Sequence, residues 1–542
     1  MNGIVRIPPP VNEPVKSYAP GSPERASLKQ RLAAMMKEEL DIPLVIGGEE
    51  IRTGKLGRTI CPHQHGHRLA SYHQAGPQEI ERAIAAAREA WRSWSETPWQ
   101  ERAAIFLKAA ELLAGPWRDT LNAATMLGQS KNVFQAEIDS ACEVIDFFRF
   151  NPHFAQQIYA DQPISPRGMW NMVEYRPLEG FVFAVTPFNF TAIGANLPSS
   201  PALMGNTVLW KPASTSILSN WYVLKLLEAA GLPPGVINFV PGRGGDVGNP
   251  VFASGEFAGI HFTGSTDTFH SMWRTMAGNL PKYKSYPRIV GETGGKDFVF
   301  AHPSADPVAL AVALTRGAFE YQGQKCSAAS RAYVPASLWK AVRDRLVAEV
   351  EAIRMGSPLD FRNFMCAVID EPSFDKTLEY IAYADASPDA DVLVGGSGDK
   401  SVGYYVKPTV VVTRDPHFKL MEEEIFAPVL TVHVYDDARL DETLAACDAT
   451  SPYALTGAIF ARDRRDIAKM AKALRHAAGN FYINDKPTGA VVGNQPFGGA
   501  RASGTNDKAG SLANLMRWTS QRTIKETFVP PVEVPYPHMG EE

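Results

Sequence analysis

The run Gly180-Phe181-Val182-Phe183-Ala184-Val185 decides the fold class, because a short apolar run rich in β-formers is typical of a buried strand. Similar runs follow at Thr207 to Leu209, Val236 to Val240 and Gly259 to Phe262. Helical segments near Ser216 to Ala230 and Val247 to Ser254 lie between them. Strands alternating with helices imply right-handed crossovers and a parallel sheet that binds its ligand at the strands' carboxyl ends. The pattern predicts an α/β protein with a dinucleotide-type domain.

The chain on either side extends this organisation. Residues 1–40 are rich in proline and charge, and we expect a wrapping arm that ends in a helix over Arg25 to Leu40. Helical spacing continues after Pro77 and over Ala136 to Phe150. Residues 291–493 repeat the α/β style and predict a second domain, whereas 164–179 and 515–528 alternate like strands.

Bulk composition excludes several classes of protein. A chain of 542 residues is long enough for about three domains. Its 54 basic and 58 acidic side chains give a net charge of −4, which offers no footprint for nucleic acid or an anionic membrane. The most apolar stretch, Phe181 to Met204, is interrupted by prolines and asparagines, so we expect no membrane span.

The cysteines and the start of the chain bear on location. The five cysteines, at 61, 142, 326, 366 and 447, are few, odd in number and scattered, as in a reducing compartment. The first ten residues lack an apolar signal core and an Arg/Ser-rich leader. We expect a cytoplasmic protein, with the mitochondrial matrix after processing as the alternative.

A lone thiol and a lone carboxylate occur in two glycine-containing segments. Cys326 of Gly323-Gln324-Lys325-Cys326 lies 34 positions after Glu292 of Gly291-Glu292-Thr293-Gly294-Gly295-Lys296. A thiolate can attack a carbonyl, and a separate base can then activate water to release the acyl group. A buried, inert cysteine is the alternative reading.

Seven motifs carry a family resemblance. They are Phe188-Asn189-Phe190, Trp210-Lys211-Pro212, Phe262-Thr263-Gly264-Ser265, Glu292-Thr293-Gly294-Gly295, Gly323-Gln324-Lys325-Cys326, Glu424-Ile425-Phe426-Ala427-Pro428 and Pro496-Phe497-Gly498-Gly499. Their order and spacing resemble the aldehyde dehydrogenase superfamily over about residues 40 to 530. Three longer stretches, 147–151, 187–194 and 495–506, look like the members that oxidise L-glutamate γ-semialdehyde.

The resemblance implies a Rossmann-type parallel-sheet cofactor domain, an α/β catalytic domain and a small β-flap used for oligomerisation. The expected division is an arm at 1–40, the NAD-binding domain at 41–163 and 180–290 with a return at 494–514, the catalytic domain at 291–493, and the flap at 164–179 and 515–535. A homodimer or higher homo-oligomer is expected.

For the cofactor, the resemblance implies NAD, although the chain has no GxGxxG fingerprint. Thr263, Gly264 and Ser265 would meet its phosphates at a strand-to-helix junction. Lys211 would bind the adenosine ribose, and Glu424 and Phe426 would contact the nicotinamide ribose and ring. Otherwise Lys211 is a solvated strand-end lysine, Glu424 an exposed acid and Phe426 a core aromatic.

Two positions depart from the family pattern. Phe269 stands where many relatives have glycine. Ser214 stands where many NAD-specific relatives have a glutamate that repels a 2′-phosphate. We therefore expect NAD preference with measurable NADP activity.

The resemblance assigns the chemistry to three residues. Cys326 adds to the aldehyde, and the Asn189 amide and the Cys326 N–H stabilise the resulting oxyanion. After hydride transfer, Glu292 activates water against the thioester. Asn189 is otherwise a turn-stabilising asparagine, and Lys296 is expected to be structural or solvent-facing.

For the substrate, Ser327 and the backbone N–H groups of Gly489 and Ala490 resemble a carboxylate anchor. Some family members have serine where this chain has Ala490. Phe190 and Phe497 would sandwich the aliphatic part, and both could equally be core packing.

The sequence therefore predicts NAD-dependent oxidation of L-glutamate γ-semialdehyde to L-glutamate in proline breakdown. Two alternatives are oxidation of another semialdehyde, such as succinic or aminoadipic, and a catalytically silent structural protein on the same fold. We expect no metal site, because Cys61, His63, His65 and His67 on one strand face would be too linear for tetrahedral zinc.

Overall fold

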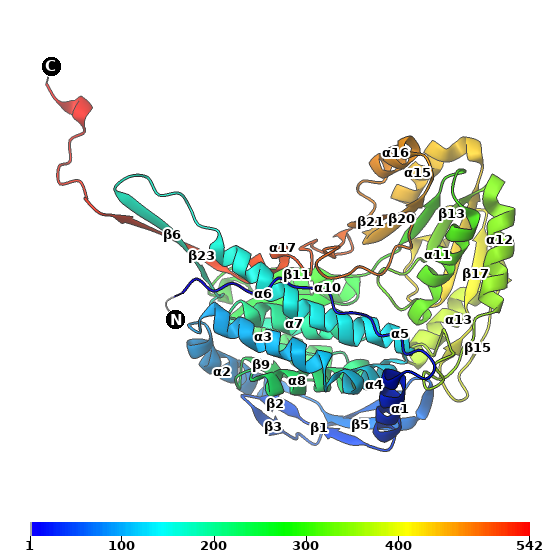
Figure 1. The fold of residues 1–542 in the computed structure, drawn as a ribbon, viewed down its shortest axis with the longest axis horizontal. Helices are drawn as coiled ribbons and strands as arrows, with labels where there is room; N and C mark the ends of the chain where they lie inside the picture. Colours follow the sequence, from blue (N-terminus) through cyan, green and yellow to red (C-terminus); the bar gives the residue numbers. More distant parts are fainter. Residues whose placement is uncertain (1–2, 542) are drawn as a thin grey trace.

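The computed structural model describes residues 3–541, and its architecture rests on two seven-stranded sheets, each flanked by helices (Figure 1). The first sheet has the order β11-β10-β7-β8-β9-β2-β3. Its strands are β11 Arg288–Glu292, β10 Phe257–Thr263, β7 Phe181–Val185, β8 Thr207–Lys211, β9 Ile237–Phe239, β2 Leu44–Ile46 and β3 Glu49–Ile51. The first five are parallel, which confirms the predicted α/β class.

Strand β7 shows how the sequence builds this sheet. All five of its residues are buried, because helices cover both faces. Phe181, Phe183 and Val185 enter one core, and Val182 and Ala184 enter the other. Successive side chains of a strand point to opposite faces, so one apolar run supplies both cores.

The helices of the first sheet divide between those cores. One face carries α2 Pro77–Trp94, α9 Gly244–Ala253 and α10 Thr266–Asn279. The other carries α3 Trp99–Ala114, α4 Arg118–Gln129, α6 Val144–Ala160, α7 Thr191–Leu203 and α8 Ile217–Ala230. Helix α6 runs beyond the predicted end at Phe150, and α4 was not predicted.

The second sheet has the order β14-β17-β18-β13-β12-β20-β21, with only β14 antiparallel to its neighbour. Its strands are β14 Ala390–Val394, β17 Thr409–Thr413, β18 Val429–Tyr435, β13 Arg331–Pro335, β12 Phe298–Ala301, β20 Thr456–Phe460 and β21 Asn480–Ile483. Helices α11 Pro307–Phe319 and α12 Ala336–Glu351 cover one face. Helices α13 Glu371–Asp385, α15 Leu440–Ala449 and α16 Arg464–Ala473 cover the other.

A two-stranded ribbon projects from the body (Figure 1). Strands β6 Met169–Arg176 and β23 Ser520–Thr527 pair antiparallel along their whole lengths. The strands predicted near 164–179 and 515–528 are thus confirmed, although α17 Leu512–Met516 occupies the start of the second segment. Among residues 3–541, no helix is long and apolar enough to cross a bilayer.

Two predictions about the N-terminal region are wrong in detail. Helix α1 spans Pro23–Met35 and not Arg25 to Leu40, because β1 Leu40–Ile42 pairs with β5 Gln64–His73, and this pairing overrides helical propensity. The Cys61-to-His67 segment does not lie on one strand, since β4 Leu56–Cys61 and β5 form a hairpin that turns at Pro62 and His63.

The N-terminal arm binds the first domain through a buried ionic cluster. Arg118 pairs with Glu13 of the arm and with Glu137 beneath it. The Tyr18 hydroxyl donates to Glu137 Oε2 at 2.8 Å. The Arg118 and Glu137 side chains are 2% and 0% exposed, so neither charge can be solvated by water. In Figure 1 the dark-blue arm runs along α6 and down to α1.

We expect Arg118→Met to destabilise the protein by about 3–5 kcal/mol, because Glu137 would remain buried without its counter-ion. Denaturant titration of the variant measures this loss. Arg92→Met is the matched control, since its pair with Glu89 is largely exposed, and it should unfold with wild type. Equal midpoints for the two variants would show that this cluster does not hold the arm.

Candidate active site

The carboxyl ends of four parallel strands collect the predicted residues at one edge of the first sheet. In the register, Val185 lies beside Lys211 and Phe262, and Thr263 lies beside Glu292. The turns that follow these strands therefore carry Asn189, Thr263 to Ser265 and Glu292 to the same edge. The N–H of Gly264 donates to the Glu292 carbonyl at 3.2 Å, which joins the predicted phosphate turn to the predicted base.

Cys326 follows a backbone turn of unusual conformation. Tyr321, Gln322 and Gly323 all have positive φ angles, of 51°, 56° and 65°. The Gln322 side-chain amide donates to the carbonyls of Ser130 and Ala367 and accepts from the N–H of Cys366. These buried bonds fix a conformation that L-residues otherwise avoid.

The Cys326 segment packs against the glycine turn after Glu292. A Cβ on Gly295 would lie 2.3 Å from the Cys326 carbonyl oxygen, so only glycine fits there. Asn189 Nδ2 donates to the Gln324 carbonyl at 3.2 Å, which brings its amide to the same segment. The structure thus brings Cys326, Glu292 and Asn189 together from three separate segments.

Both reactive groups are half-buried. Burial, together with the nearby Asp297, Glu292 and Glu424 carboxyls, holds the pKa of the Cys326 thiol well above its ordinary value. Burial raises the pKa of Glu292 to about 8, although its Oε2 accepts from the N–H of Gly499 at 3.1 Å. A carboxyl with a pKa near neutrality is suited to general base work.

Glu424 and Phe426 lie beside this centre. Glu424 Oε1 accepts from the N–H of Gly295 at 2.8 Å, and burial raises the pKa of Glu424 to about 7. Phe426 has a φ of 63° and meets Phe188 edge-on, with 5.8 Å between ring centroids. Glu424 is therefore half-buried and hydrogen-bonded, and not the exposed acid of the alternative reading.

The predicted phosphate turn has the features of an anion site. Ser265 caps α10, and its hydroxyl accepts from the N–H of Thr268. The remaining first-turn N–H groups of α10 have no intrahelical acceptor, and they point to the same strand edge.

Lys211 ends β8 and is half-buried, and partial loss of hydration lowers the pKa of its ammonium, so it is not a freely solvated lysine. Phe269 stacks on Phe262 and fills the space beside Gly291. These residues fit a dinucleotide phosphate and ribose.

The substrate candidates are a proposed carboxylate anchor, at Ser327, Gly489 and Ala490, and two aromatic residues, Phe190 and Phe497. The Ser327 hydroxyl lies 2.8 Å from the Thr488 hydroxyl, which joins Ser327 to the turn of Gly489 and Ala490. Phe190 lies beneath the Lys131 ammonium, 4.1 Å from the ring centroid. Phe497 is held by paired backbone hydrogen bonds to Ala509. Ser327 and Phe190 directly follow Cys326 and Asn189 in the chain, so both lie next to the predicted catalytic residues.

Sequence reasoning missed the residues that support Asn189 and Phe190. Asp139 accepts from the N–H groups of Thr191 and Ala192 and also from Lys131 Nζ at 2.6 Å. The buried Asp139 and Lys131 therefore fix the start of α7, directly after Phe190. The sequence offered no signal for these two, because Glu137, Glu143, Asp146 and Arg149 carry charge in the same region. Lys296, expected to be structural or solvent-facing, is buried.

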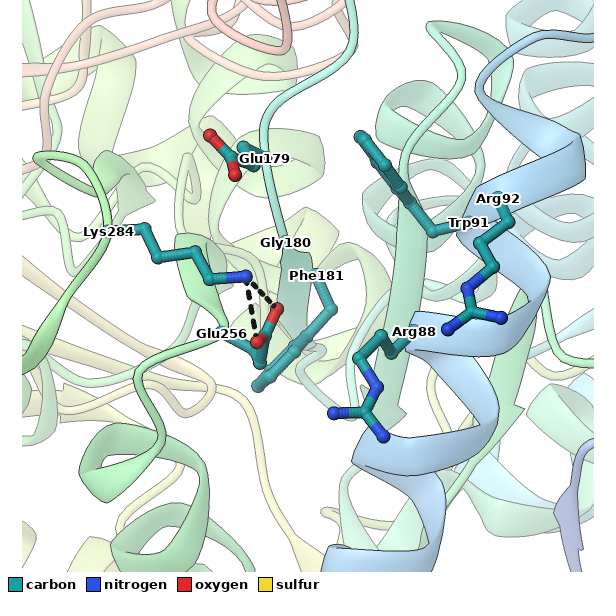
Figure 2. A pocket seen from close by; sticks show the side chains of 8 residues that line it. All are labelled: Arg88, Trp91, Arg92, Glu179, Gly180, Phe181, Glu256 and Lys284. Carbon is teal, nitrogen blue, oxygen red and sulfur yellow. Dashed lines mark hydrogen bonds and ion pairs between the residues drawn. The ribbon is translucent and has the colours of Figure 1, made fainter.

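A separate hollow of about 160 Å³ lies at the amino end of β7, away from these residues. Figure 2 shows Arg88, Arg92 and Lys284 around it, with Trp91 on one wall and Glu256 paired to Lys284. Its lining includes no thiol and no histidine. The chemistry is therefore assigned to the carboxyl edge of the sheet.

Comparison with known proteins agrees with this geometry. Residues 52–524 match the model of the aldehyde dehydrogenase family. The chain is 55% identical to Delta-1-pyrroline-5-carboxylate dehydrogenase, mitochondrial, from Dictyostelium discoideum, over 98% of this chain and 96% of that protein. It is 49% identical to the human protein of the same name, over 97% and 94%. The crystal structure of the Delta-pyrroline-5-carboxylate dehydrogenase from Mycobacterium tuberculosis bound with NAD superposes with a TM-score of 0.97, at 53% identity and full coverage of both chains.

Gly323→Ala should lower both the midpoint of thermal unfolding and the reactivity of Cys326 toward an alkylating agent. A Cβ at Gly323 would lie 2.3 Å from the Ala427 carbonyl oxygen, and its φ is positive. The control is Gly278→Ala in α10, where a Cβ meets nothing within 4 Å. Should both variants melt and react like wild type, the turn before Cys326 is not conformationally constrained.

Proposed function

The chain belongs to the aldehyde dehydrogenase family, and from this membership we propose that it oxidises L-glutamate γ-semialdehyde to L-glutamate with reduction of NAD. The observation that carries the proposal is the meeting of Cys326, Glu292 and Asn189 at one strand edge, in a chain about half identical to named pyrroline-carboxylate dehydrogenases. The cyclic imine opens to the aldehyde without help, so the step belongs to proline breakdown.

In the proposed mechanism, the Cys326 thiol first gives its proton to solvent. The thiolate Sγ then forms a bond to the aldehyde carbon, and the electron pair of the C=O bond moves to the oxygen, which becomes an oxyanion. Asn189 Nδ2 and the Cys326 N–H donate to that oxygen, where negative charge develops. NAD, when bound, accepts the hydride that leaves the carbon. Glu292 takes a proton from water, which attacks the thioester and releases the acid and the thiolate.

We propose the following cofactor contacts, which the same geometry supports. Thr263, Gly264, Ser265 and the first turn of α10 hold phosphate, Lys211 holds the adenosine ribose, and Glu424 and Phe426 hold the nicotinamide end. No carboxylate stands at Ser214, three residues after Lys211. We therefore propose NAD preference with measurable NADP use, and equal rates with the two cofactors would contradict it.

For the substrate, we propose that Ser327 and the N–H groups of Gly489 and Ala490 bind the far carboxylate, while Phe190 and Phe497 contact the methylenes. The Ser327 to Thr488 contact supports this, because it brings a hydroxyl to the turn that supplies the backbone donors. Oxidation of succinic or aminoadipic semialdehyde is the second candidate, since each also carries a terminal carboxylate.

We propose that the β6–β23 ribbon serves as an oligomerisation flap, and that the two sheets and their helices form the NAD-binding and catalytic domains. Ile164, Trp170, Phe528 and Val529 on and beside the ribbon are exposed, which supports contact with a second copy. Light scattering should give at least twice the 59.2 kDa chain mass.

All five cysteines are free, which fits a reducing compartment. We propose the cytoplasm or, as for the relatives named mitochondrial, the mitochondrial matrix.

The function is tested by NADH formation with pyrroline-5-carboxylate against a panel of succinic, aminoadipic and simple aliphatic aldehydes. We expect kcat/KM to be at least about tenfold higher for pyrroline-5-carboxylate, because only its open form matches both the carboxylate anchor and the chain length. Cys326→Ser should abolish turnover, whereas Cys61→Ala should retain it. A higher kcat/KM for another semialdehyde would reassign the substrate.

Glu292→Gln should separate the two halves of the reaction. Acylation and hydride transfer need no base at Glu292, so rapid mixing should show a burst of NADH followed by a slow steady state. In wild type, the rate of thioester hydrolysis should rise with pH to a midpoint near the Glu292 pKa of about 8, because only the ionised carboxylate accepts a proton. A variant without a burst would assign Glu292 to an earlier step.

A further inference from the structure

Lys508 lies behind the segment that holds Glu292. Its Nζ donates to the carbonyls of Gly479 and Gly498, both at 2.8 Å, and to Asn480 Oδ1 at 3.3 Å. An ammonium group has three donors, and here neutral oxygens accept all of them. Within residues 3–541 no carboxylate lies at ion-pair distance from Nζ. Lys508 is thus a half-buried cation whose charge has no direct partner.

Gly498 connects this cation to Glu292. Its carbonyl accepts from Lys508 Nζ, and its α-carbon faces Glu292 so closely that a Cβ would lie 3.0 Å from Oε1. The next residue, Gly499, donates its N–H to Glu292 Oε2. Asn480 completes the clamp, because it accepts from the N–H of Gly498 and donates to the carbonyl of Pro496.

We propose that Lys508 is a positioning residue for water activation: it clamps the Gly498 peptide so that Gly499 meets the Glu292 carboxylate, and its unpaired charge favours the ionised form of that carboxylate. The inference rests on the proposed function only in taking Glu292 as the base. It adds a residue from a different segment, whose ammonium acts through the protein and touches no reacting atom.

The titratable groups near Glu292 come from two segments, the turn of Asp507 and Lys508 and the segment of Cys326. Lys508 lowers the pKa of Glu292, and Asp507 on the same turn raises it. Asp507 is itself offset by Arg517, whose Nε lies 3.4 Å from it. The Cys326 thiol approaches from the second sheet. Of these groups, Lys508 alone carries a positive charge without a carboxylate partner, so its removal should produce the largest change.

Without Lys508 the ionised form of Glu292 loses a favourable interaction, so the pKa of Glu292 moves further up. At any pH below the midpoint, less of the base is then ionised, and a rise of one in the Glu292 pKa slows thioester hydrolysis by about tenfold. At high pH Glu292 is ionised both in wild type and in the protein without Lys508, so their rates of thioester hydrolysis should become equal.

The experiment measures the NADH burst and the following steady state of the full-length protein from pH 6 to 10, with wild type, Lys508→Met and Lys508→Arg. For Lys508→Met we expect an unchanged burst, an about tenfold slower steady state at pH 7, recovery near pH 9.5 and a midpoint that lies about one pH unit higher. Lys508→Arg should stay within about threefold of wild type. Lys282→Met, at an exposed lysine, is the control and should match wild type.

Asn480→Asp provides a second route should Lys508→Met fold poorly. It keeps an acceptor for Lys508 but places a carboxylate beside the ammonium, so the midpoint should again move up. A pH-independent loss, or an equally slowed burst, in the folded variants would overturn the proposal and leave Lys508 with a structural role. Failure of wild type to form NADH from any aldehyde would instead overturn the proposed function.

Discussion

The parallel register of β7, β8, β10 and β11 is the constraint on which the site depends. It aligns the ends of four strands, so that turns distant in sequence meet at one edge. The hydrogen bond from Gly264 to the Glu292 carbonyl shows how tight this alignment is. A shift of one residue would send the side chains of a strand to the opposite core and remove the turns from their positions.

The second constraint is the close approach of backbones around Cys326. Gly295 lies against the Cys326 carbonyl, Gly294 against the Glu424 carboxyl, and Gly323 against the Ala427 carbonyl. Each contact leaves no room for a side chain. The glycines in these motifs therefore serve packing between the two sheets, and the ionisable groups they bring together are desolvated as a result, which is why their pKa values rise.

The sequence predicted the parts of the fold that depend on local patterns. The run over 180–185 is recognisable because its apolar residues fill two cores, and Lys211 was correctly placed at a strand end. The hairpin of β4 and β5 and the early end of α1 could not be foreseen, because both depend on pairing between segments far apart in the chain. At the site, Cys326 and Glu292 were visible through their glycine motifs. Asp139 and Lys508 were not, because they act through hydrogen bonds to backbone groups of other segments, and no local motif marks such contacts.

Two helices begin at this edge of the first sheet, and they differ in what their amino ends offer. Asp139 neutralises the start of α7, taking up the N–H groups of Thr191 and Ala192. At the start of α10, the uncharged Ser265 hydroxyl accepts from the N–H of Thr268, and the one first-turn carboxylate, Asp267, is exposed to water. The positive end of the helix dipole is thus neutralised by a buried carboxylate next to the residues assigned to the aldehyde, and it is offset only by an exposed one next to the phosphate turn. The electrostatic potential therefore differs between the two ends of a long anionic ligand at this edge. This difference favours one orientation of the ligand before any specific hydrogen bond forms.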